Sequence, residues 1–98
     1  MSDQPDIINA RFAQEDELVS RRNLRHLLTR RRNERISARQ TDNGWPVTVY
    51  AHPDTISELS VDNDPEEAHT MDFEGKLFMQ SPLIGDPSLE RGVFVIEW

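Results

Sequence analysis

The chain has 98 residues, the length of one domain, and no cysteine, so disulfides and thiolate metal sites are excluded. Hydrophobic residues make up 36% and charged residues 30%, which predicts a small core that gains from a partner or a second copy. No apolar run approaches the roughly 18 residues that span a bilayer, and the first ten residues lack a secretory signal pattern. We therefore expect a cytoplasmic protein, or one incorporated into a larger assembly made in the cytoplasm.

The net charge of −7 is distributed unevenly along the chain. Residues 1–40 hold nine arginines and six acidic residues, a net of +3, whereas residues 41–98 hold Lys76 and Arg91 against twelve acidic residues, a net of −10. Such asymmetry indicates either a charged partner or pairing between two parts of one protein. Within a single domain we distinguish three parts, which are an extended arm (1–9), an arginine-rich helix (10–33) and an acidic β-rich core (34–98).

The helix predicted over residues 10–33 contains neither Gly nor Pro. Its acidic residues lie toward the N-terminal end and its arginines toward the C-terminal end, which suits the helix macrodipole. An alternative start is Ser20, with the acidic run before it belonging to a connection. Leu24, Leu27 and Leu28 follow i, i+3, i+4 spacing and form a narrow apolar stripe, which packs on the protein's own sheet or docks in a partner's groove.

The hydrophobic period changes from helix-like to strand-like after residue 34. Residues 35–40 and 45–51 alternate in polarity on either side of Asn43 and Gly44, which predicts a β-hairpin. Residues 55–61 fit either a short helix with a capping-box pattern or a short strand.

The rest of the chain predicts a hairpin, a loop and a strand. The hairpin covers residues 69–80 and turns at a Glu-Gly pair. Two prolines and two glycines predict a loop over residues 81–92, in which Leu83 and Ile84 are held by the core or by a partner. Residues 93–98 alternate and give the clearest strand.

Together these elements predict an α+β fold. It consists of one N-terminal arginine-rich helix and a small antiparallel β-sheet, or partly open barrel, of about four to five strands. Six of the seven aromatic residues follow residue 44, so the core is expected in the sheet.

The arginine cluster is the main candidate for a functional site. Eight arginines fall within nineteen residues, and the guanidinium fork binds phosphate or carboxylate through two hydrogen bonds. The pattern predicts pairing with acidic groups of the same protein or of a protein partner, contact with nucleic acid, or simply a solvated helix face. Residues 29–35 loosely resemble the arginine-rich RNA-binding peptides of phage antiterminators, over too few residues to assign a family. The cluster comprises Arg21, Arg22, Arg25, Arg30, Arg31, Arg32, Arg35 and Arg39.

A candidate acidic face comprises Asp62, Asp64, Glu66 and Glu67. Such a face either keeps the protein soluble or imitates a nucleic-acid backbone. Residues 62–66 have oxygen ligands at alternate positions, as at the start of an EF-hand calcium loop. The EF-hand pattern then requires Gly at its sixth position and Glu at its twelfth, but these positions are Glu67 and Phe73. No metal site is therefore predicted.

No motif for nucleophilic, phosphate-binding or metal-dependent catalysis occurs in the sequence, so we predict no catalytic residue and no cofactor. The first hypothesis is a non-enzymatic interaction or assembly protein that docks through charged surfaces onto a protein partner or a second copy, without a membrane or a small-molecule substrate. Its size and layout are like those of small accessory or structural proteins of phages and mobile elements. The alternatives are a protein that binds RNA or DNA through residues 21–39, and an acidic inhibitor that competes with nucleic acid for a basic partner.

Overall fold

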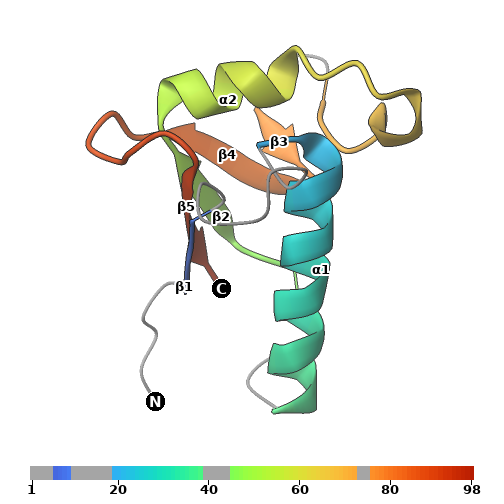
Figure 1. Cartoon of the computed structure of the whole chain (residues 1–98). Helices are drawn as coiled ribbons and strands as arrows, with labels where there is room; N and C mark the ends of the chain where they lie inside the picture. The colour runs from blue at the N-terminus through green and yellow to red at the C-terminus, as the bar shows by residue number, and fades with distance from the viewer. Residues whose placement is uncertain (1–5, 10–18, 39–44, 73–75) are drawn as a thin grey trace.

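The computed structural model describes residues 6–9, 19–38, 45–72 and 76–98 (Figure 1). These residues confirm an α+β fold, with two α-helices and a five-stranded sheet that is open rather than closed into a barrel. Along the chain the elements are β1 (Asp6–Asn9), α1 (Arg21–Ser37), β2 (Thr48–Ala51), α2 (Pro53–Ser60), the 3-10 helix η3 (Pro65–Glu67), β3 (Leu77–Phe78), β4 (Ser81–Gly85) and β5 (Val93–Glu97).

The sheet has the strand order β1-β5-β2-β4-β3 and is mixed. β2 and β4 run parallel, and the other neighbours are antiparallel. A parallel pair needs a long connection, and here that connection contains α2. β5, the last strand along the chain, lies between β1 and β2.

Both α-helices pack on the same face of the sheet. Gly85 on β4 shows the close approach of α2, because a Cβ atom added to it would lie 3.3 Å from the Cγ atom of Pro53. Leu24 and Leu28 bring α1 into the same buried cluster as the strands, and each such burial stabilises the fold by roughly 1.5–3 kcal/mol. The cluster comprises Ile8, Leu24, Leu28, Val49, Ala51, Leu59, Met71, Phe78, Leu83, Phe94 and Ile96.

Helix α1 begins where the alternative start at Ser20 predicted, and residues 10–18 of the longer prediction lie outside the described residues. It continues to Ser37, so the strand predicted over residues 35–40 is wrong at residues 35–37. The alternation of polar and apolar residues over 35–40 does not indicate a buried strand face, because Ile36 is 36% exposed and does not belong to the core. Residues 39–44, with the turn predicted at Asn43 and Gly44, are not among the described residues.

Residues 55–61 resolve in favour of the helical alternative, because α2 covers Pro53–Ser60. His52 caps α2, since its Nδ1 atom accepts a hydrogen bond of 2.9 Å from the backbone N–H of Asp54. Thr55, the residue expected to cap the helix, is instead buried, and its Oγ1 atom accepts a bond of 2.9 Å from the backbone N–H of Gly92.

The loop predicted over residues 81–92 is wrong at residues 81–85, which form β4. Pro82 is tolerated because the ladder with β2 begins only at Leu83, so the missing N–H is not needed. β3 turns into β4 through Met79 and Gln80, with φ of 48° and 73°, two positive values that Asn and Gly usually supply. The Glu-Gly pair at positions 74 and 75 lies outside the described residues, and the strand predicted over residues 93–98 is confirmed as β5.

Candidate interaction surface on helix α1

The first turn of α1 is bonded to the end of α2. Ser20 caps α1, and its Oγ atom accepts a bond of 3.1 Å from the backbone N–H three residues on. The backbone N–H of Arg21 donates to Asp62 Oδ2 at 2.9 Å. The Arg21 guanidinium donates to the carbonyl oxygens of Leu59 at 2.8 Å and Ser60 at 3.1 Å, in the last turn of α2, where carbonyls lack the i+4 donors of a continuing helix. Arg21 is therefore engaged inside the fold.

The next two arginines bind the acidic segment around η3. Arg22 Nη2 lies 2.8 Å from Asp64 Oδ2 and 2.8 Å from Glu66 Oε2. Arg25 donates two hydrogen bonds to Glu67, from Nε to Oε1 at 2.6 Å and from Nη2 to Oε2 at 2.8 Å. The Glu67 side chain is only 2% exposed and that of Arg25 is 30% exposed. This bidentate pair is largely removed from water, unlike the pairs of Arg22.

The electrostatics of this pair keep both partners charged. Hydrogen bonds from Arg25 lower the pKa of Glu67 below its ordinary value, and they outweigh burial, which acts in the opposite direction. The positive charges of Arg25 and Arg22 add to the lowering. The same hydrogen bonds raise the pKa of Arg25, while its burial opposes the rise.

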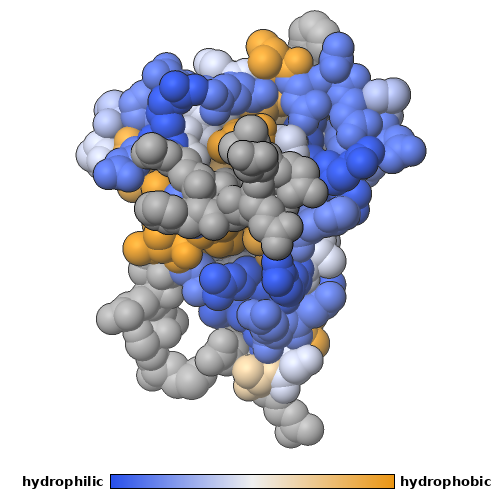
Figure 2. All heavy atoms as spheres, viewed as in Figure 1, coloured by the Kyte–Doolittle hydropathy of each residue, from blue (hydrophilic) through white to orange (hydrophobic). Residues whose placement is uncertain are grey.

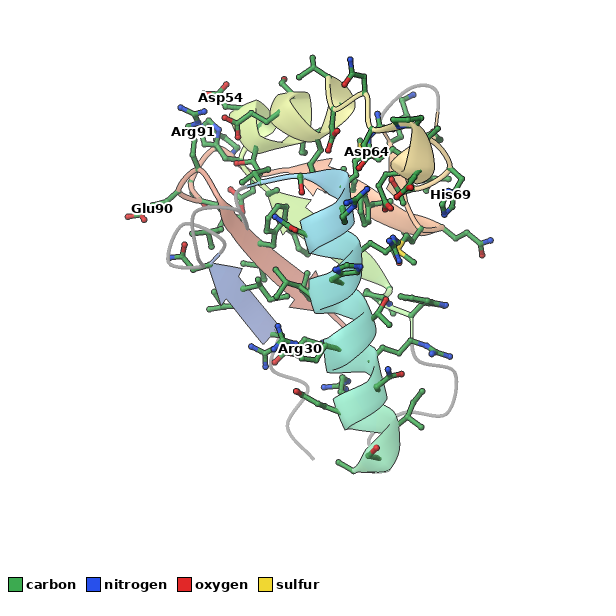
Figure 3. The ribbon with its side chains drawn as sticks, turned by 45° about the vertical axis from the view of Figure 1, so that its right-hand side comes forward. Arg30, Asp54, Asp64, His69, Glu90 and Arg91 are labelled. Carbon is green, nitrogen blue, oxygen red and sulfur yellow. The ribbon has the colours of Figure 1, made fainter. Side chains whose placement is uncertain are left out.

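The second half of α1, residues 29–37, differs from the first half, residues 21–28. Within the part of the chain that the structure describes, the side chains of Arg30 and Arg31 make no hydrogen bond and no ion pair. Arg30 is exposed and Arg31 is half-buried. Arg30 lies on the portion of α1 that is distant from α2 (Figure 3).

Two arginines of the second half stack on tryptophan rings. The guanidinium carbon of Arg32 lies 4.9 Å from the centre of the Trp45 ring, and that of Arg35 lies 4.9 Å from the centre of the Trp98 ring. The Nε atoms of both arginines are buried without a hydrogen-bond acceptor, as expected for guanidiniums against indole faces. Trp98 is itself fixed, because its Nε1 atom donates to Asp6 Oδ2 at 2.8 Å. The stacks therefore restrict the motion of both guanidinium groups.

Charge is separated between the two ends of the molecule. Residues 53–72, which include α2 and η3, contain seven acidic residues and no lysine or arginine, whereas residues 29–37 contain four arginines and one glutamate. Figure 3 shows Arg30 well apart from Asp54 and Asp64, which lie around α2 and the following loop. The hydrophilic colour in Figure 2 follows both α1 and the region around η3. The first three arginines neutralise part of the acidic end, and the remainder stand apart from it.

Of the five apolar residues proposed for docking, four pack in or against the core and one is exposed. Leu24 and Leu28 are 2% and 0% exposed, and Leu27 packs against the core, so the stripe packs on the protein's own sheet. Leu83 also belongs to the core, whereas Ile84 is 45% exposed on the opposite face of the sheet. Arg39 lies outside the described residues.

The candidate acidic face, residues 62–67, lies in a single segment whose carboxylates bind the first half of α1. Glu67 is buried, so it is not part of an exposed face, and Asp62 and Asp64 are half-buried. Only Glu66 has a mainly exposed side chain, at 78%. These carboxylates chiefly position α1.

Sequence reasoning missed the tryptophans as partners of arginine. Trp45 and Trp98 fitted the strand alternation, which gave no reason to separate them from the core. The available signal was the i, i+3 spacing of Arg32 and Arg35, which places both on one side of α1. Their pairing with residues at the ends of two strands needed the tertiary structure.

Among the described residues, no three His, Asp or Glu side chains are grouped so that they could hold a metal ion. No helix in the same part of the chain has the length and apolar character needed to cross a membrane. Comparison with known proteins gives no match to a family model, to a curated protein or to a solved structure. The chemistry of α1 is therefore the basis for a functional proposal.

Proposed function

We propose that the protein is a non-enzymatic interaction protein that docks onto, or assembles with, an acidic protein surface through the second half of α1. The observation that supports this proposal is the contrast between the arginines. Arg21, Arg22 and Arg25 bind acceptors within the fold. Arg30 and Arg31 have no such acceptor among the described residues, so their charge remains available to a partner.

The stacked arginines strengthen the proposal. A guanidinium held against an indole ring has already lost much of its rotational freedom, so less entropy is lost when it binds a carboxylate. Arg32 and Arg35 would add two such groups in the same half of α1 as Arg30 and Arg31. The acidic residues at the other end of the molecule would repel an acidic partner and so favour approach to this end.

A charge-matched pair of double variants tests the proposal, with polyglutamate as the acidic probe. Arg30→Ala with Arg31→Ala should weaken binding of polyglutamate at low salt by about two- to thirtyfold, because two solvent-accessible ion pairs contribute roughly 0.2–1 kcal/mol each and about 1.4 kcal/mol is a tenfold change. Arg22→Ala with Arg91→Ala removes the same charge from exposed, acid-paired positions and should leave binding nearly unchanged. Equal losses in both variants, or a monomer that binds no polyglutamate at low salt, would contradict the proposal.

Nucleic-acid binding through the same residues is the second candidate. The observation in its favour is that unpaired arginines and two tryptophan rings occur at one end of the protein, a combination that suits single-stranded nucleic acid. The net charge of −7 opposes it at long range. It predicts a log–log salt slope of about −0.7 per phosphate contacted by a single strand. An oligonucleotide that binds more tightly than polyglutamate of equal charge would favour this candidate.

The acidic-inhibitor alternative has less support. Asp62, Asp64 and Glu67 already accept hydrogen bonds or ion pairs from the first half of α1. A basic partner would have to displace these contacts of α1 before it could use the same carboxylates.

A further inference from the structure

The face of the sheet opposite the helices carries an unbroken apolar row. Ile7 on β1 is in register with Val95 on β5, Val95 with Tyr50 on β2, and Tyr50 with Ile84 on β4. Side chains alternate between the faces of a strand, and Ile8, Phe94 and Ile96 on the same strands belong to the core. The four residues of this apolar row therefore share the outer face.

The apolar row is accessible to solvent. Ile7 is 64% exposed and Ile84 is 45% exposed, while Val95 and Tyr50 are half-buried between their neighbours. Leu77 on β3, at 39% exposed, extends the apolar character of this face. An antiparallel sheet with one solvated face normally places polar residues there, and an exposed apolar patch marks an interaction site.

Two carboxylates flank the apolar row on opposite sides. Glu97 lies two residues beyond Val95 on β5, and its Oε2 atom accepts a bond of 3.4 Å from the hydroxyl of Tyr50. Asp86 lies two residues beyond Ile84, directly after β4. Ser88 donates to Asp86 Oδ1 from its backbone N–H at 2.9 Å and from its hydroxyl at 2.6 Å, which lowers the pKa of Asp86. The outward-facing described residues of the five strands include no lysine and no arginine.

We propose that this face is a docking surface for a basic amphipathic helix of a partner protein. The apolar stripe of that helix would cover the apolar row, and its flanking Lys or Arg side chains would face Glu97 and Asp86. Four strands about 4.8 Å apart give a row about 14 Å long, which about ten residues of α-helix would cover. A second copy is a poorer occupant, because it would bring the same carboxylates and a net charge of −7 against an equal charge. This surface lies on the sheet face away from α1 and is independent of the arginines.

Two synthetic helical peptides test the occupant, one with leucines flanked by lysines and one with the same leucines flanked by glutamates. The lysine peptide should bind, and Ile84→Ser or Ile7→Ser should weaken its binding about tenfold through lost apolar contact. Val61→Ser alters an apolar residue that is 78% exposed at the end of α2, so it serves as the control and should have no effect. Both serine changes are at exposed positions, so the fold should be retained.

Charge variants complete the test. Glu97→Gln with Asp86→Asn should weaken binding of the lysine peptide several-fold. Asp54→Asn with Glu66→Gln removes equal charge elsewhere and should not weaken it. Equal binding of the glutamate peptide, or equal loss in the two charge variants, would overturn the proposal. A dimer that Ile84→Ser abolishes would assign the face to a second copy and would overturn it as well.

Discussion

Both halves of α1 are rich in arginine, but their arginines have different surroundings. In the first half, the arginines bind carbonyl and carboxylate oxygens of the segment from α2 to η3. In the second half, two arginines stack on tryptophans, and two others have no partner among the described residues. The comparison teaches that an arginine run does not have one role, because the neighbouring elements determine which guanidiniums are neutralised.

Helix geometry explains where the change occurs. A helix rises about 1.5 Å per residue, so residues nine positions apart on α1 lie about 13 Å apart along its axis. The acidic residues that follow α2 reach the beginning of α1, from Arg21 to Arg25. Beyond that point, α1 meets Trp45, which lies ahead of β2, and Trp98, which directly follows β5.

The largest expected effect comes from breaking the buried pair in the first half. Arg25→Ala should lower the free energy of unfolding by about 3 kcal/mol, because Glu67 is left buried and unpaired. Arg30→Ala in the second half should change it by no more than about 0.5 kcal/mol. Urea denaturation of both variants would check the contrast, and equal effects would remove the distinction between the halves.

The same pair predicts a smaller effect of acid. The pKa of Glu67 is lowered in the folded state, so its contribution is complete above its unfolded pKa and is lost as pH falls through the folded pKa. Wild-type stability should therefore fall more steeply in acid than that of Glu67→Gln, and the two curves should converge at low pH. Parallel stability curves from urea denaturation across this range would show that the Arg25–Glu67 pair does not contribute in this way.

A small loss of stability is expected when an arginine of the second half loses its stack on tryptophan. Arg35→Ala should lower the free energy of unfolding by about 0.5–1 kcal/mol, the usual contribution of a partly exposed cation–π contact. It should also change the fluorescence of Trp98, which is best measured with Trp45→Phe in the background. Arg30→Ala serves as the matched control, and an unchanged emission for Arg35→Ala would contradict the stacked arrangement.

The sequence predicted features that depend on local pattern. Ser20 as an alternative helix start and the strand at β5 follow from capping and alternation, and both are found. The strand β4 was missed because proline is usually a loop residue. Only the register with β2, which begins at Leu83, shows that the strand can accommodate Pro82. The sequence also did not predict which arginines of α1 are neutralised within the fold. That depends on contacts between residues about forty positions apart, such as Arg25 and Glu67.

The position of β5 has a consequence for folding kinetics. β1 pairs only with β5 among the described strands, and the partners Asp6 and Ile96 are 90 positions apart. Closing so large a loop costs conformational entropy before the contact is gained, and non-local pairing slows folding. β1 is therefore expected to join the sheet late, after β2, α2 and β4 have formed around their shorter connection. During synthesis, the edge of β2 that later receives β5 would stay open until β5 itself leaves the ribosome.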